Sequence, residues 1–263
     1  DAGTKFGLGE KTGIPLAGER GGRLPTPELF RERYDDAGKN LKPGETNPMG
    51  RRNWTAGDNV NMSIGQGEVL VTPLQLANAY ATLANGGTHY KPLLVQKVTK
   101  PTDANKDPLA ADNPAEEVQV FNPVVKNQLT FGTATDGRSH LEVLQAGFQG
   151  VISNGRGTAN KMWEETGGLP GIWSAKTGTA ELGTKSKPKA DGSVFALYGP
   201  VDAPFGPNYA ISVIIPESGF GADTAGPTAV RIMAPLVNGN LPPAPKVDED
   251  RALPPVPPLK VKP

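Results

Sequence analysis

Glycine and proline set the strongest limit on what this chain can fold into, because each of them interrupts regular secondary structure. The 263 residues include 33 glycines and 27 prolines. The segment 6–48 is dense in both, which predicts a long ordered loop with one helical turn near 28–34. The segment 241–263 is rich in proline and is expected to be an extended, solvated tail. We therefore expect one folded domain over 1–240 and a tail over 241–263.

Two helices have clear sequence signals. Thr72 is a suitable N-cap, Pro73 suits the first helical position, and Gln75 stands in the capping-box position. The glycine pair at 86–87 is expected to end this helix. A second helix is predicted over 141–153, where apolar residues recur at helical spacing.

Three strands are predicted in the C-terminal half, separated by short, turn-rich links that favour an antiparallel meander. They span 171–181, 193–200 and 209–216. The segment 228–237 can supply a helix that covers the sheet, with Pro235 ending or kinking it late. A further strand is expected at 93–98, and the polar, proline-broken segment 100–117 is expected to be an exposed loop.

Charge and composition exclude several classes of function. The 27 basic and 27 acidic residues balance, so the chain has no basic field to hold nucleic acid. With no cysteine and two histidines far apart in the sequence, we expect neither a metal nor a cofactor. The longest apolar stretches have the length of a strand, so no membrane span is expected. The chain begins at Asp1 without an initiator methionine or a signal peptide, and we interpret it as part of a longer precursor.

The segment 174–181, SAKTGTAE, is the most informative for chemistry. A phosphate-binding loop is excluded, because Pro170 and Ala175 stand where its two glycines belong. On a strand, the ammonium of Lys176 can instead stabilise negative charge, and Gly178 allows a ligand to approach closely. An ordinary edge strand with a solvated lysine remains the alternative reading of this segment alone.

Longer motifs elsewhere give this segment a context. In chain order they are FGLG at 6–9, TGI at 12–14, SIGQG at 63–67, TPLQLA at 72–77, GTA at 157–159 and KTGTAE at 176–181. Together they resemble class B penicillin-binding proteins of the elongation type, like penicillin-binding protein 2, over about 4–236. The resemblance implies a mixed α/β fold in which helices cover both faces of an antiparallel sheet, as in serine beta-lactamases. It also implies that the fold is incomplete at its N-terminal side.

In function, the resemblance implies a peptidoglycan D,D-transpeptidase that cross-links stem peptides through a serine acyl-enzyme. By position, Lys176 would be the catalytic lysine of the K-T-G motif, and Thr177, Gly178 and Thr179 would bind substrate. The backbone N–H of Thr179 would be one donor of the oxyanion hole.

The other two motifs of the family, S-x-x-K and S-x-N, are expected before residue 1, so the nucleophile is expected outside this chain and the chain alone inactive. The one literal S-x-x-K begins at Ser186, after the K-T-G motif, and is expected to be an exposed turn.

The expected partners are peptidoglycan stem peptides, beta-lactams as covalent inhibitors, and the cell-wall elongation machinery. The expected location is the outer face of a bacterial plasma membrane, with an anchor upstream of this chain. Two alternatives stay open: a serine beta-lactamase or beta-lactam sensor, and a non-catalytic interaction module. Missing sheet partners also predict that the isolated fragment is poorly stable, which a cooperative thermal transition would contradict.

Overall fold

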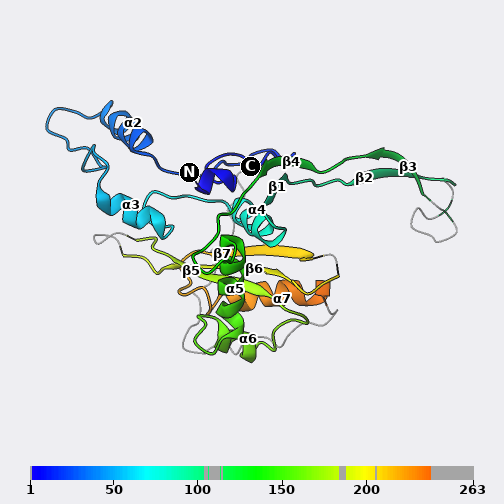
Figure 1. Cartoon of the computed structure of the whole chain (residues 1–263). Helices are drawn as coiled ribbons and strands as arrows, with labels where there is room; N and C mark the ends of the chain where they lie inside the picture. Colours follow the sequence, from blue (N-terminus) through cyan, green and yellow to red (C-terminus); the bar gives the residue numbers. More distant parts are fainter. Residues whose placement is uncertain are drawn as a thin grey trace, which may run out of the picture.

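The computed structural model describes residues 2–103, 106, 113, 115–183, 188–204 and 206–237 (Figure 1). The helices in these residues are α1 (Ala2–Lys5), α2 (Pro27–Gly38), α3 (Ala56–Ser63), α4 (Pro73–Ala84), α5 (His140–Ser153), α6 (Asn160–Glu165) and α7 (Ala225–Val237). The strands are β1 (Thr88–Lys91), β2 (Lys97–Pro101), β3 (Ala115–Val120), β4 (Val124–Gln128), β5 (Ser174–Ala180), β6 (Gly192–Gly199) and β7 (Tyr209–Ile215).

The central sheet has the strand order β5-β6-β7, and both pairs are antiparallel. The predicted meander is therefore confirmed. β6 lies in the middle, and most of its residues are buried, as expected of a strand covered on both faces.

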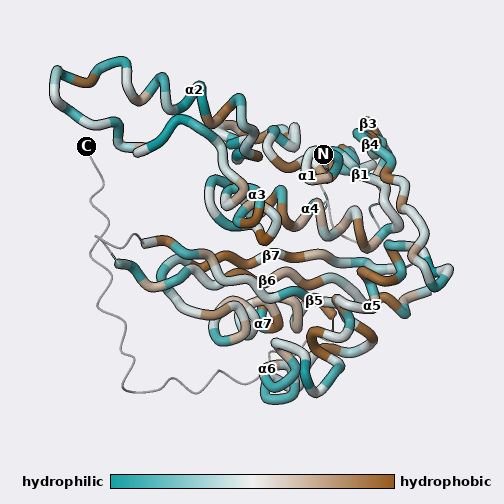
Figure 2. Tube along the Cα trace, turned by 60° about the vertical axis from the view of Figure 1, so that its left-hand side comes forward, coloured by the Kyte–Doolittle hydropathy of each residue, from teal (hydrophilic) through white to brown (hydrophobic). Residues whose placement is uncertain are grey.

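Helices cover both faces of this sheet (Figure 2). On one face, the ring of Tyr80 in α4 lies 6.5 Å from the ring of Tyr198 in β6. On the other face, Phe195 and Leu197 are fully buried in a cluster with residues of α7. Because successive side chains of a strand alternate between faces, Tyr198 and Leu197 point to opposite layers. The expected fold, an antiparallel sheet with helices on both faces, is confirmed.

The helix after Thr72 forms as its sequence predicts. The Thr72 hydroxyl accepts a hydrogen bond from the Gln75 backbone N–H at 3.2 Å, and Gln75 Oε1 accepts one from the Thr72 backbone N–H at 2.8 Å. The predicted helix over 141–153 is confirmed as α5, and Ser139 is its N-cap. The adjacent Ser139 and His140 therefore have a structural role at a helix start.

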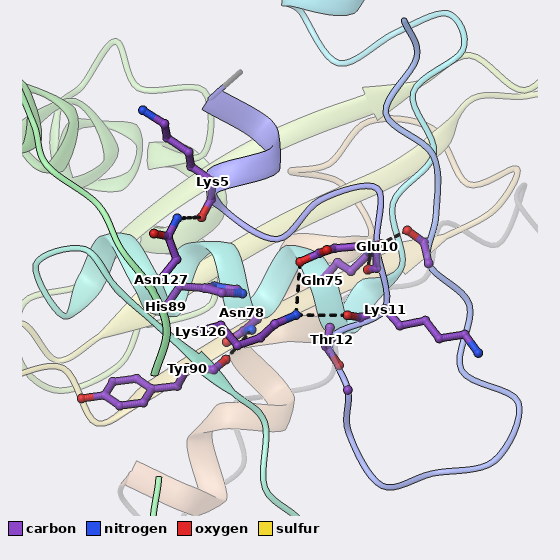
Figure 3. A network of polar contacts seen from close by, with 12 residues as sticks. Lys5, Glu10, Lys11, Thr12, Gln75, Asn78, His89, Tyr90, Lys126 and Asn127 are labelled. Carbon is purple, nitrogen blue, oxygen red and sulfur yellow. Dashed lines mark hydrogen bonds and ion pairs between the residues drawn. The ribbon is translucent and has the colours of Figure 1, made fainter. Parts of the chain in front are cut away.

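Side chains of α4 and β4 hold the N-terminal segment (Figure 3). Gln75 Nε2 donates hydrogen bonds to the carbonyl oxygens of Glu10 at 2.6 Å and Gly21 at 2.7 Å. Lys126 Nζ lies 3.1 Å from the Glu10 carboxylate. Buried His89 lies among these groups, with its Nδ1 3.1 Å from the Thr82 hydroxyl. The segment is thus tied to the helix that packs on the sheet.

Three elements differ from the sequence-based expectation. In place of one helical turn near 28–34, α2 runs for 12 residues, because Thr26 caps it and Pro27 occupies its first position. The strand expected at 93–98 begins later than predicted: 92–96 lie between β1 and β2, and β2 starts at Lys97. The C-terminal helix starts at Ala225 and continues through Pro235 to Val237.

Two further antiparallel pairs, β1–β4 and β2–β3, form an arm that continues from the end of α4 (Figure 1). β2 and β3 include both ends of the segment 100–117, whose middle lies mostly outside the described residues. The expected tail over 241–263 and Ser186 also lie outside them, so the division at residue 240 stays a prediction. No helix in the described part of the chain is long and apolar enough to cross a membrane.

Candidate active site

The K-T-G segment occupies β5, which is an outer strand of the sheet as the structure describes it. On its inner side β5 pairs with β6, with Lys176 opposite Ala196 and Thr179 opposite Ser193. Its first two residues are buried, whereas Lys176 is exposed and the residues after it are half-buried. The chain thus anchors one end of the strand in the core and presents the K-T-G residues at an edge.

The side chain of Lys176 is exposed at the strand edge. Its Nζ donates a hydrogen bond to the backbone carbonyl oxygen of Thr177 at 2.6 Å. Within the described residues, no carboxylate lies within ion-pair distance of this ammonium. Because the lysine is solvated and has no counter-ion there, it can attract an anionic group at the strand edge.

The two threonines of the segment share one face of β5, since residues two apart in a strand point the same way. The Thr177 hydroxyl lies 2.8 Å from the hydroxyl of Thr158, in the loop between α5 and α6. The Thr179 hydroxyl makes no hydrogen bond to any described residue. The Thr177 hydroxyl is therefore oriented by Thr158, whereas the Thr179 hydroxyl has no hydrogen-bond partner among the described residues.

A side chain from far upstream reaches the same edge. Gln66, in the loop after α3, donates from Nε2 to the backbone carbonyl oxygen of Thr179 at 2.8 Å. Neither Gln66 nor Thr158 was assigned a role from the sequence by itself. Both lie in motifs of the resemblance, SIGQG and GTA, and those motifs are the signal that could have indicated them.

Ion pairs hold the loop that carries Gln66. Glu68 binds both Arg23 and Arg33. Gly67 and Glu68 also line a cavity of about 350 Å³ between α2 and α3. Arg51 and Asp58 also line this cavity, and a hydrogen bond from Arg51 lowers the pKa of the Asp58 carboxyl to about 2. The loop that carries Gln66 therefore lies between this cavity, which is lined by charged side chains, and β5.

Across the described ranges, no group of three or more histidine, aspartate or glutamate side chains could hold a metal ion. The polar groups that the K-T-G segment of β5 itself presents are one ammonium, two hydroxyls and the outward backbone groups of an edge strand. Such groups bind carboxylates and stabilise an oxyanion.

Comparison with known proteins identifies the arrangement. Residues 1–236 match the family model described as the penicillin binding protein transpeptidase domain. The chain belongs to this penicillin-binding transpeptidase family. Antiparallel strands with helices on both faces, and K-T-G on an edge strand, agree with that assignment.

Individual relatives are peptidoglycan D,D-transpeptidases and penicillin-binding proteins. The chain is 26% identical over 239 residues to the peptidoglycan D,D-transpeptidase MrdA of Haemophilus influenzae, covering 90% of this chain and 32% of the relative. It is 31% identical over 219 residues to penicillin-binding protein 2A of Bacillus subtilis, covering 81% of this chain and 24% of the relative. The chain therefore spans less than a third of the length of these relatives.

One solved structure is similar at the level of fold and sequence. Its description reads "Structural coordination of polymerization and crosslinking by a peptidoglycan synthase complex". It aligns with this chain with a TM-score of 0.57 and 28% sequence identity. The alignment covers 87% of this penicillin-binding transpeptidase chain and 31% of that structure's chain.

Proposed function

We propose that this chain supplies the K-T-G side of the active site of a peptidoglycan D,D-transpeptidase. The observation that carries the proposal is the sequence KTGTAE on an outer strand, where, among the described residues, the Lys176 ammonium has no carboxylate partner and the Thr179 hydroxyl makes no hydrogen bond. The family match and the relatives named as D,D-transpeptidases support it.

In the proposed reaction, a serine hydroxyl upstream of this chain attacks the penultimate D-Ala carbonyl of a stem peptide. The C–N bond to the terminal D-Ala breaks, an acyl-enzyme forms, and an amine of a neighbouring strand then takes the acyl group. A beta-lactam mimics the donor, and its ring carbonyl is attacked by the same serine.

Each residue of β5 has a role in that reaction. Lys176 stabilises negative charge at the site, and the hydroxyls of Thr177 and Thr179 bind the carboxylate of the donor peptide. Gly178 allows the peptide to lie close to the strand. The backbone N–H of Thr179 donates to the oxygen that becomes negative in the tetrahedral intermediate.

The proposed partners are peptidoglycan stem peptides and the cell-wall elongation machinery. The proposal of the elongation machinery as a partner rests on the similarity to a structure described as a peptidoglycan synthase complex. Because the substrate is extracytoplasmic, we place the protein at the outer face of the plasma membrane.

The test is the intact mass of the protein encoded by the complete gene after incubation with benzylpenicillin, followed by peptide mapping. We expect one penicilloyl adduct on a serine upstream of this chain, and a Lys176→Ala variant should form it at least about a hundredfold more slowly. Rapid release of hydrolysed penicillin would indicate a beta-lactamase. No adduct on the complete protein would indicate a non-catalytic module.

A further inference from the structure

The outer edge of β5 is occupied at one point in the free protein. Among the side-chain hydrogen bonds of the described residues, the one from Gln66 Nε2 to the Thr179 carbonyl oxygen is the one that reaches the β5 backbone from outside the strand. Gln66 lies 113 residues before Thr179 in the chain. The contact is therefore a tertiary one and has no local cause.

The backbone groups of Thr179 point away from the sheet. In an antiparallel ladder, the N–H and C=O of one residue point to the same side, and the sides alternate along the strand. Side chains reach the carbonyls of Thr177 and Thr179, which are two residues apart and so share a side. This is the side to which an extended peptide would add as a further strand.

Gln66 lies in the space that such a peptide needs. A strand added to β5 would run about 4.8 Å from it. A nitrogen 2.8 Å from the Thr179 carbonyl oxygen lies inside that distance. An added peptide and the Gln66 side chain therefore cannot both occupy this position. The carbonyl oxygen could accept a second hydrogen bond, but the space beside it holds only one of the two groups.

The loop that carries Gln66 is fixed, whereas the side chain itself is held by one bond. The Gln66 backbone N–H donates to the carbonyl oxygen of Asn61 at 2.9 Å, and Glu68 binds two arginines. Beyond the bond to Thr179, the Gln66 amide makes no other hydrogen bond within the described part of the chain. It can therefore swing away without moving the loop.

We propose that Gln66 is a gate residue of the substrate edge: it covers Thr179 in the free protein and is displaced when the donor peptide adds to β5. This rests on the proposed function, because the same edge is taken as the substrate site. The gate also explains how the protein keeps an open edge strand from pairing with other chains, which exposed edges otherwise do.

Two variants test the gate. Gln66→Ala removes the side chain, and Gln66→Met keeps its length but cannot donate a hydrogen bond. Gln145→Ala is the matched control, because Gln145 Nε2 also donates to a backbone carbonyl oxygen, that of Leu83, at 2.9 Å and does not bond to β5. All are made in the protein encoded by the complete gene.

The readouts are the second-order rate of acylation by benzylpenicillin, and KM and kcat for an N-acetylated tripeptide that ends in D-Ala-D-Ala. Loss of one neutral hydrogen bond in the free state predicts acylation about fivefold faster and KM about fivefold lower for Gln66→Ala, with kcat unchanged. Gln66→Met should change in the same direction, and Gln145→Ala should match the wild type. A merely structural role for Gln66 would lower kcat or leave both parameters unchanged.

Binding of the same peptide, measured by calorimetry with the lysine variant Lys176→Ala as background, separates the two proposals. Tighter peptide binding in the Gln66 variants, together with no penicilloyl adduct on the protein that retains Lys176, would support the gate and reject the transpeptidase chemistry. Normal acylation of the wild type with no gain in Gln66→Ala would reject the gate and leave the chemistry standing.

Discussion

Replacing Gly157 by alanine should both destabilise the protein and disturb the hydroxyl pair at β5. Gly157 precedes Thr158, whose hydroxyl lies 2.8 Å from that of Thr177. A methyl group at position 157 would lie 2.3 Å from the carbonyl oxygen of Val151 and 2.4 Å from that of Gly150. Both oxygens belong to the last turn of α5, whose backbone cannot turn aside as a flexible side chain can.

The size of the effect follows from these contacts. Overpacking costs about 1–3 kcal/mol, and contact with backbone on two sides indicates about 3 kcal/mol. For a domain of this size, each kcal/mol lowers the melting temperature by about 2–4 °C, so we expect a fall of about 6–12 °C. Relief of the clash must move the loop, and with it Thr158.

Gly155→Ala is the matched control in the same loop, because a methyl group there meets nothing within 4 Å. Thermal unfolding and the rate of benzylpenicillin acylation are measured for both variants in the complete protein. Gly157→Ala should melt lower and acylate more slowly, whereas Gly155→Ala should match the wild type. Equal melting temperatures for the two variants would refute the reasoning, because the end of α5 would then yield to the added methyl group.

Two other predictions concern stability. Thr72→Ala removes the N-cap hydroxyl of α4 and should lower the free energy of unfolding in urea by about 1 kcal/mol, whereas Thr72→Ser should retain most of it. Burial lowers the pKa of His89, and Lys126 lowers it further while Glu10 opposes the shift. The unfolded chain therefore binds a proton that the folded chain does not as the pH falls below about 6.5, and stability should fall there by at most about 1.4 kcal/mol per pH unit. His89→Gln should flatten that slope, and an unchanged slope would contradict the assignment.

The elements that the sequence predicts well are those with local signals. The N-cap, proline and capping-box residues at 72–75 lie within one turn, so the start of α4 can be read without knowing the rest of the fold. The strands β6 and β7 have apolar runs, and the links between β5, β6 and β7 are short, so the order of an antiparallel meander follows.

The elements that the sequence predicts poorly lack such signals. All six residues of β3 are exposed, so no buried face produces an apolar alternation, and its pairing with β2 is not visible in the sequence. The length of α2 was underestimated because it buries one residue, Phe30, and therefore has little apolar periodicity.

The candidate site divides in the same way. Lys176, Thr177 and Thr179 are contiguous, so a motif indicates them together. Thr158 lies 19 residues from its partner Thr177, and Gln66 lies 113 residues from Thr179, so neither contact has a local pattern. Both depend on how separate elements pack.

Several motif residues outside β5 have structural roles, and this changes what the resemblance is evidence for. A methyl group at Gly7, where φ is +74°, would lie 2.5 Å from His89 Nε2, so a glycine is required for the close approach to this buried ring. Gln75 joins α4 to the N-terminal segment by two hydrogen bonds, and Glu19 accepts bonds from the backbone N–H groups of Thr12 and Gly13. These residues preserve the packing that places α4 on the sheet, and they would be retained by a relative that had lost its chemistry. The FGLG, TGI and TPLQ motifs therefore argue for the fold, whereas the case for acyl transfer rests on β5 and on what Gln66 and Thr158 do at its edge.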